Sequence, residues 1–171
     1  MFLEAAMAEN KHDLKEQVRE LIYNTCIHLD DHQWEHWHDN CADNFNYAIR
    51  AFSPEVQADI KYHGGDKEYM QSITSMLSKH NSDQSPLRRH CTVYRVEIAA
   101  DGKSAAAISS LAVYQTQLDG INSHVDAGTT SVFLVGRYND KFIIDGDSIK
   151  FEDREVRLDT RRLDKGTHWP I

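Results

Sequence analysis

One uncharged stretch, Ala105–Leu118 (AAAISSLAVYQTQL), limits the folds that this chain can adopt. It contains no proline, glycine or charged residue, and its second half alternates in the way typical of a strand. At about 3.3 Å per residue the stretch would extend roughly 46 Å, whereas a compact domain of this size is only about 40 Å across. We therefore predict one long strand that bends, and two shorter strands with a break are the alternative.

Side-chain parity places the predicted bend at Ser109–Ser110. Ile108 lies on one face of a regular strand, and Leu111 and Val113 lie on the other. A one-residue β-bulge at Ser109–Ser110 would bring all three apolar side chains onto the same face. A long curved sheet also needs a cover for its concave side, and the predicted N-terminal helices are the elements that can provide it.

Composition excludes several classes of protein. The chain has 171 residues, a net charge of −8 and no lysine–arginine block longer than two residues, so nucleic acid and anionic membranes are poor partners. Cys26, Cys41 and Cys91 are odd in number and far apart, which favours a reducing, cytoplasmic compartment over a disulfide framework. No run of 18 apolar residues spans a membrane, and the first residues do not resemble a signal peptide.

Along the chain, helices come first and strands follow. Residues 1–12 are predicted to be a flexible leader, and Asp13 is predicted to cap the first helix of a single domain over 13–171, with Glu16 completing a capping box. The predicted helices are Leu14–Leu29, His32–Cys41 and Lys67–Lys79. The predicted strands are Phe45–Ile49, Ala58–Tyr62, Leu87–Ala99, Ala105–Leu118, Thr129–Tyr138, Lys141–Ile144 and Ile149–Leu158.

Two local patterns add detail to this order. Asn139–Asp140 is predicted to be a turn between two strands, and the apolar run Val132–Val135 is expected to be covered on both faces. Helices followed by an antiparallel meander indicate an α+β fold and not an alternating α/β fold.

The C-terminal segment Asp159–Ile171 (DTRRLDKGTHWPI) matches neither a helix nor a strand. It nevertheless ends in Trp169, Pro170 and Ile171, which are unfavourable in water. Either this tail folds onto its own domain, or it is an arm that docks on another subunit. We favour the arm.

One short motif, His32–Gln33–Trp34–Glu35–His36, matches the H-x-x-E-H pattern of zinc peptidases. In that pattern two histidines four residues apart bind the metal from one helix face, and the glutamate acts as the base. The chain has ten histidines, so chance matches are expected, and a downstream acidic ligand is not evident. We interpret the motif as a solvated or interfacial histidine face.

Arg88, Arg89 and His90 form a small basic cluster at the start of a predicted strand. They are either a charged strand edge or an intersubunit contact, with a phosphate site as a weaker alternative. A buried pair of Asp30 with His90 would instead provide the general base of a dehydratase or isomerase. The sequence alone does not bring these two residues together.

Four segments carry a family resemblance. SPLRRHCTVYRVEI and REVRLDTRRLDKGTHWPI resemble the Arg–His strand and the closing segment of the small (β) subunits of Rieske aromatic-ring-hydroxylating dioxygenases. YAIRAFSPEV and KHNSDQSPLRRHCTVY are similar to the methanesulfonate monooxygenase branch of that family. The similarity runs from about residue 14 to the end, although Trp169 stands where a smaller apolar residue is expected.

The resemblance implies a cystatin-like, nuclear transport factor 2-like cone, in which a curved antiparallel sheet wraps around the N-terminal helices. It implies a non-catalytic structural subunit with no cofactor of its own. The Rieske [2Fe–2S] cluster and a mononuclear Fe(II) are expected in a catalytic large (α) subunit, in a hexamer of three large and three small subunits. The subunit-interface candidates that it implies are Arg88, Arg89, His90, Arg161, Thr167, His168 and Trp169.

Two other functions remain open at this stage, a stand-alone cone-fold dehydratase or isomerase and a small-ligand binding module. The substrate also stays open between an alkanesulfonate and an aromatic compound, because substrate contacts would lie in the partner chain.

Overall fold

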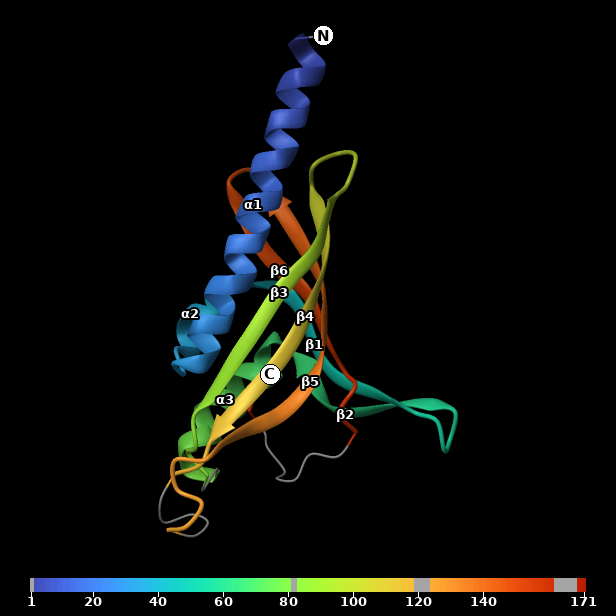
Figure 1. Cartoon of the computed structure of the whole chain (residues 1–171). Coiled ribbons are helices and arrows are strands. Elements are labelled where there is room, and N and C mark those ends of the chain that lie inside the picture. Colours follow the sequence, from blue (N-terminus) through green and yellow to red (C-terminus); the bar gives the residue numbers. More distant parts are fainter. Residues whose placement is uncertain (1, 81–82, 119–123, 162–168) are drawn as a thin grey trace.

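A computed structural model of the chain describes residues 2–80, 83–118, 124–161 and 169–171 (Figure 1). Three helices lie in these ranges: α1 (Phe2–Asp30), α2 (Trp34–Asp39) and α3 (Lys67–His80). The strands there are β1 (Cys41–Ser53), β2 (Ala58–Asp66), β3 (Leu87–Ile98), β4 (Ser104–Thr116), β5 (Thr130–Asp145) and β6 (Ser148–Leu158).

The strands form one six-stranded sheet in the order β2-β1-β6-β5-β4-β3. From β3 to β6 the chain makes the predicted antiparallel meander, and β1 pairs with β2 as an antiparallel hairpin. The β1–β6 pair is parallel, so the prediction of a wholly antiparallel sheet is wrong at this one junction. The reason is connectivity, because α3 carries the chain from the β1–β2 hairpin to the far edge of the sheet.

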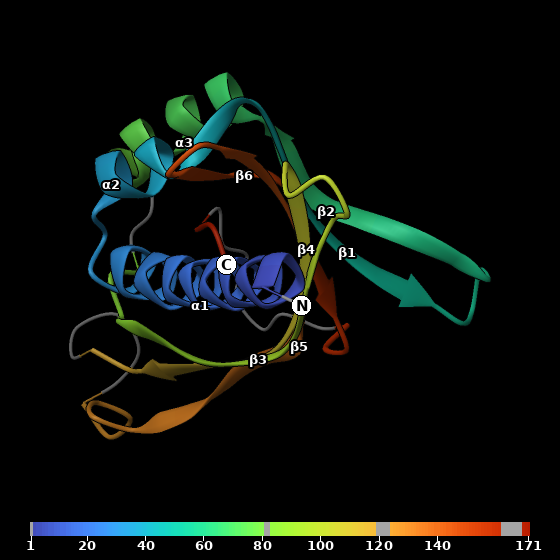
Figure 2. The same cartoon turned by 90° about the horizontal axis from the view of Figure 1, so that it is seen from above.

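The sheet curves around α1, as predicted for a cone (Figure 2). The helix buries one stripe, with Val18 and Ile22 fully buried and Leu29 only 1% exposed. From the sheet, Leu111 and Val113 of β4 face this stripe and are also fully buried. The hydrophobic core therefore lies between the helix and the concave side of the sheet.

Strand β4 confirms the predicted long strand but not the predicted bulge. Every second residue from Ala105 to Gln115 is buried, without a break at Ser109–Ser110. Ser109 itself faces the core and is fully buried, so Ile108 points to the outer face. The irregularity lies instead on the partner strand, between Val93 and Arg95 of β3. Such a β-bulge bends the strand that carries it.

Strand β5 runs through the predicted turn. Asp140 is 2% exposed and occupies an inward-facing position of a continuous strand, so the turn at Asn139–Asp140 is wrong. The prediction that Val132–Val135 is covered on both faces is also wrong for the single chain. Leu134 is fully buried, but Val132 is 53% and Val135 39% exposed on the outer face.

Helix α1 begins at Phe2, so Asp13 lies within the helix and does not cap it. The residues before Asp13 are mostly alanine, glutamate, methionine and leucine, which favour helix, and this explains why the helix continues. The predicted start of α3 is confirmed, since the Asp66 carboxylate accepts a hydrogen bond from the backbone N–H of Tyr69 at 2.8 Å. Within the described ranges, no helix is long and apolar enough to cross a bilayer.

Candidate functional site

The last three residues of the chain lie inside the cone, beside α1 (Figure 2). Trp169 is 8% exposed and Ile171 is 1% exposed. The indole of Trp169 stacks on the His32 ring with centroids 4.4 Å apart and lies 5.5 Å from the Trp34 ring. Residues 169–171 therefore fold onto their own domain and do not extend as an arm toward another subunit. The rest of the predicted arm, residues 162–168 with Thr167 and His168, lies outside the described residues.

The backbone of this segment is held by two buried side chains. Arg89 Nη2 donates a hydrogen bond to the Pro170 carbonyl at 2.6 Å. The Tyr47 hydroxyl accepts a hydrogen bond from the Ile171 N–H at 2.7 Å and donates one to the Ile171 carbonyl at 3.1 Å. Burial raises the pKa of Tyr47 to about 12, so this phenol is neutral and remains a donor.

Arg89 is anchored to the end of helix α1. Its Nη1 lies 2.5 Å from the Asp30 carboxylate, and its backbone N–H lies 3.1 Å from the same group. The Arg89 side chain is only 1% exposed, so this ion pair is buried. The Nε of Arg89 is buried and has no hydrogen-bond partner among the described residues.

The proposed Asp30–His90 pair does not form. Strand alternation turns His90 to the outer face, where it is exposed and its ring lies 4.9 Å from the Tyr114 ring. Asp30 meets the preceding residue, Arg89, instead. A permanently charged guanidinium does not act as a general base, so this arrangement removes the dehydratase hypothesis that rested on the pair.

Deeper in the cone, Arg154 of β6 binds Asp140 of β5 in a side-on, bidentate manner. Its Nε and Nη2 donate to the two carboxylate oxygens at 2.8 and 2.9 Å, and both side chains are at most 1% exposed. The Arg154 guanidinium also lies over the rings of Tyr138 and Phe151, at 4.0 and 4.4 Å from their centroids. Burial raises the pKa of Asp140, and the charge of Arg154 opposes that rise.

Two thiols lie next to this pair. Cys26 of α1 and Cys91 of β3 are free, and a hydrogen bond between them lowers the pKa of Cys26 and raises that of Cys91. The spacing of the cysteines and histidines does not match the ligands of a Rieske cluster. In the part of the chain that the structure describes, no three His, Cys, Asp or Glu side chains gather in a way that could hold a metal ion.

The H-x-x-E-H motif does not form a shared helix face. His32 has a φ of 56° and precedes α2, so of the motif only Trp34, Glu35 and His36 lie on that helix. The His32 ring stacks on both Trp34 and Trp169, which also contact each other, and the His36 ring lies 5.4 Å from the His28 ring. These histidines serve aromatic packing in this structure.

The remaining interface candidates lie on the surface. Arg88 is exposed and lies 3.0 Å from Asp31. Arg161 lies 2.6 Å from Glu55 at the tip of the β1–β2 hairpin, which projects from the body of the cone (Figure 1). Because no partner chain is present, the interface role of the candidate residues stays a prediction.

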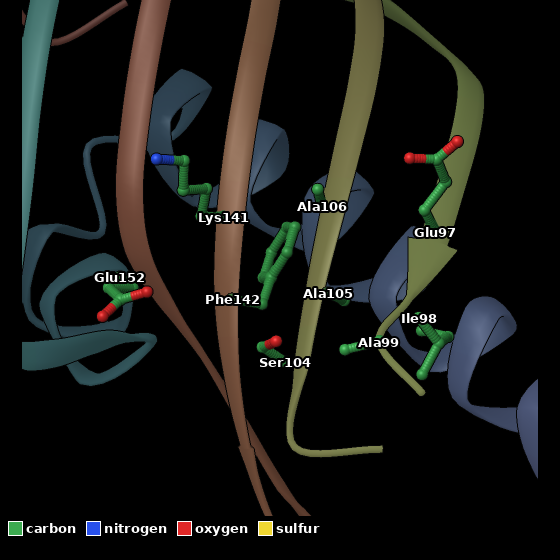
Figure 3. A pocket seen from close by; sticks show the side chains of 9 residues that line it. All are labelled: Glu97, Ile98, Ala99, Ser104, Ala105, Ala106, Lys141, Phe142 and Glu152. Carbon is green, nitrogen blue, oxygen red and sulfur yellow. The ribbon is translucent and has the colours of Figure 1, made fainter. Parts of the chain in front are cut away.

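An open depression of about 400 Å³ lies where the end of β3 and the start of β4 meet β5 and β6 (Figure 3). Its charged groups are Glu97, Lys141 and Glu152, and they come from β3, β5 and β6. Figure 3 shows them well separated around Phe142, so they do not converge on one point as an acid–base pair would. The surroundings of Arg89, where Tyr47 and residues 169–171 meet, are therefore the better candidate site.

Sequence reasoning missed the Arg154–Asp140 pair as members of the interior. A usable signal exists for the pair, because Asp140 and Arg154 occupy core-facing positions in otherwise apolar strand patterns. A charge at such a position needs a partner. The alternation of Phe45, Tyr47 and Ile49 with polar residues did indicate that Tyr47 is buried, but nothing in the sequence singled it out as a site residue.

Comparison with known proteins agrees with this architecture. Residues 11–155 match the model of the SnoaL-like domain. The chain belongs to the SnoaL-like family. It is 47% identical, over 93% of its length and 88% of the relative, to the methanesulfonate monooxygenase hydroxylase subunit beta of Methylosulfonomonas methylovora. It is 28% identical, over 90% of its length and 97% of the relative, to the 2-aminobenzenesulfonate 2,3-dioxygenase subunit beta of an Alcaligenes species.

Within this family the chain is an oxygenase small subunit, as its segments predicted. Among solved structures, a chain assigned as the β subunit of an aromatic-ring-hydroxylating dioxygenase from Novosphingobium aromaticivorans superposes with a TM-score of 0.71. That match has 22% identity and covers 89% of this chain and 93% of the other, so it bears on the fold alone. The predicted cone is confirmed.

Proposed function

We propose that this chain is the non-catalytic small subunit of a Rieske-type oxygenase of the methanesulfonate monooxygenase kind, and that it supports the assembly of catalytic large subunits. The observation that carries the proposal is the 47% identity to such a subunit over almost the whole chain. Both curated relatives are named for sulfonated compounds, so we propose a sulfonate as the substrate of the assembled enzyme.

In this proposal the chemistry belongs to the large subunit, which holds the Rieske [2Fe–2S] cluster and the mononuclear iron. The small subunits form a trimer within a cytoplasmic hexamer of three large and three small chains. The closed interior supports a scaffold role, since its strongest polar groups, Asp30 with Arg89 and Asp140 with Arg154, are already paired with each other.

The outer face of β3, β4 and β5 is the surface that we propose for contacts between small subunits. The register sets His90, Ala112 and Val135 in one row across the three strands, and Arg88, Tyr114 and Val132 in another. Val132 and Val135 expose apolar surface there, beside the two basic interface candidates Arg88 and His90. Such a mixed apolar and basic patch is typical of a protein interface.

Co-expression with the large subunit tests the proposal. Native mass spectrometry of the purified complex is expected to find three copies of each chain. The double variant Val132→Glu/Val135→Glu is expected to shift the complex to smaller species, because it buries two carboxylates in the proposed contact. The chain on its own is expected to turn over no sulfonate.

The matched control is Val56→Glu, which introduces the same charge at a valine that is 65% exposed on the β1–β2 hairpin. It is expected to leave the hexamer intact. A complex that survives the double variant but not Val56→Glu would place the contact on the hairpin instead. Sulfonate turnover by the isolated chain would contradict the scaffold role.

A further inference from the structure

The segment Trp169–Ile171 is held in the cone in the way that a protein holds a small ligand. An aromatic body lies against other rings, since the Trp169 indole stacks on His32 and packs beside Trp34. Next to this body, hydrogen-bond acceptors meet buried donors, namely Arg89 and the Tyr47 hydroxyl. The site is defined by His32, Trp34, Tyr47 and Arg89, and we refer to it as the inner site.

Arg89 shows which chemistry this site accepts. A guanidinium offers a side-on pair of donors, Nε and Nη2, that matches the two oxygens of a carboxylate or sulfonate. In Arg89 only half of that pair is used, because Nη2 donates to the single carbonyl oxygen of Pro170 and the buried Nε has no partner among the described residues. Arg154 shows the complete arrangement in the same protein, with Nε and Nη2 both bound to Asp140.

We propose that the inner site is a binding site for small aromatic oxyanions, aryl carboxylates or aryl sulfonates, and that Trp169–Ile171 occupy it as a built-in competing ligand. The aromatic ring of the ligand takes the place of the Trp169 indole, stacked on His32 and beside Trp34. Its anionic group takes both side-on donors of Arg89, and the Tyr47 hydroxyl provides a third. Asp30 keeps Arg89 in position through Nη1, which the ligand does not need.

Competition sets the expected size of the effect. The apparent dissociation constant of a ligand is its intrinsic value divided by the fraction of molecules whose site is open, so it rises steeply when the built-in ligand fills most sites. The full-length variant Trp169→Ala removes the aromatic part of the built-in ligand and keeps all other groups of the site. It is expected to bind benzoate and benzenesulfonate at least about tenfold more tightly than the unmodified chain.

The experiment measures both probes by isothermal titration calorimetry with the purified full-length chain. Arg89→Lys, made in the Trp169→Ala background, keeps a cation for Asp30 but lacks the side-on donor pair, and it is expected to lose at least about tenfold in affinity. Benzyl alcohol, which has a ring and no charge, is expected to bind much more weakly than benzoate. A peptide with the sequence of residues 167–171 is expected to displace benzoate from the Trp169→Ala variant.

Thermal unfolding of each variant shows whether it is folded. If the Arg89→Lys double variant does not fold, Tyr47→Phe in the Trp169→Ala background replaces it and is expected to weaken benzoate binding severalfold. Equal benzoate affinity in the unmodified chain and in Trp169→Ala overturns the proposal. Benzyl alcohol binding as tightly as benzoate also overturns it, because the site would then recognise only the ring. None of these results depends on the large subunit, so they leave the proposed scaffold role untouched.

Discussion

Asp30 receives hydrogen bonds from both the backbone and the side chain of Arg89, so one carboxylate joins the end of α1 to the start of β3. The Arg89 side chain is 1% exposed, and removing its partner leaves a buried positive charge. We expect Asp30→Asn to lower the free energy of unfolding by about 3–5 kcal/mol, measured by urea denaturation.

Asp31→Asn is the control for this prediction. Asp31 is the neighbouring residue and also pairs with an arginine, but both Asp31 and Arg88 are largely exposed. An exposed pair contributes about 0–1 kcal/mol, so the control is expected to change little. Equal losses in the two variants would show that the burial of Arg89 does not determine the effect.

The Arg154–Asp140 pair leads to a prediction about non-additivity. Each single change, Arg154→Met or Asp140→Leu, leaves one buried charge without its partner and is expected to cost about 3–5 kcal/mol of stability. The double variant removes both charges, and we expect it to be more stable than either single variant. A double-mutant cycle with urea unfolding measures the coupling. Additive losses would mean that the bidentate pair contributes no specific interaction.

The elements with a strong local signal could be predicted from the sequence. Helix α3 begins at Lys67 as predicted, because Asp66 caps the helix, although strand β2 runs through Gly64–Gly65 and ends only at Asp66. The long strand β4 was also predictable, since no residue in it breaks a strand. Asp140 was assigned to a turn because an Asn–Asp dipeptide is typical of one, and this outweighed its core-facing position in the strand alternation.

Predicting the candidate site required knowing which residues of β3 point into the cone. The hypothesis of an Asp30–His90 pair chose a partner one residue away from the true one, and that single step decides between buried Arg89 and exposed His90. Local pattern does not settle this choice, because Arg88, Arg89 and His90 are all polar. The tail is a similar case. Trp169 and Ile171 indicate that the end of the chain needs cover, but composition does not reveal which chain provides it.

Gly64 of β2 leads to a prediction about backbone packing. Its φ is 144°, and a Cβ at this position would lie 2.2 Å from the carbonyl oxygen of Tyr47. We expect Gly64→Ala to destabilise the fold by at least about 2 kcal/mol, because backbone atoms on β1 must shift to make room. Gly102→Ala is the matched control, since Gly102 also has a positive φ of 71° but no atom within 4 Å of the added Cβ.

The control is expected to lose only about 1 kcal/mol, the usual penalty of a positive φ without a clash. Thermal unfolding of both variants provides the comparison. If Gly102→Ala proves as destabilising as Gly64→Ala, the contact with the Tyr47 carbonyl has no energetic weight and backbone conformation alone explains both losses.

His38 leads to a prediction about acid stability. Its Nε2 lies 2.9 Å from Thr74 Oγ1, and that hydroxyl donates to the Met70 carbonyl, so the histidine must donate and is the Nε2–H tautomer. The buried Nδ1 has no partner among the described residues, so a proton placed there is not satisfied. Burial lowers the pKa of His38 to about 4, and the charge of Lys67 contributes while that of Asp39 opposes it.

A histidine whose pKa is lower in the folded than in the unfolded state stabilises the fold fully above about pH 6.5 and loses that contribution as the pH falls toward 4. We therefore expect the free energy of unfolding to fall by about 1–3 kcal/mol more over this range in the unmodified chain than in His38→Gln. His90→Gln, at an exposed histidine on the outer face, is expected to behave like the unmodified chain. Urea unfolding at half-unit pH steps measures the three curves. Parallel curves for His38→Gln and the unmodified chain would mean that the pKa of His38 is the same in the folded and unfolded states, so that burial does not disfavour the charged ring.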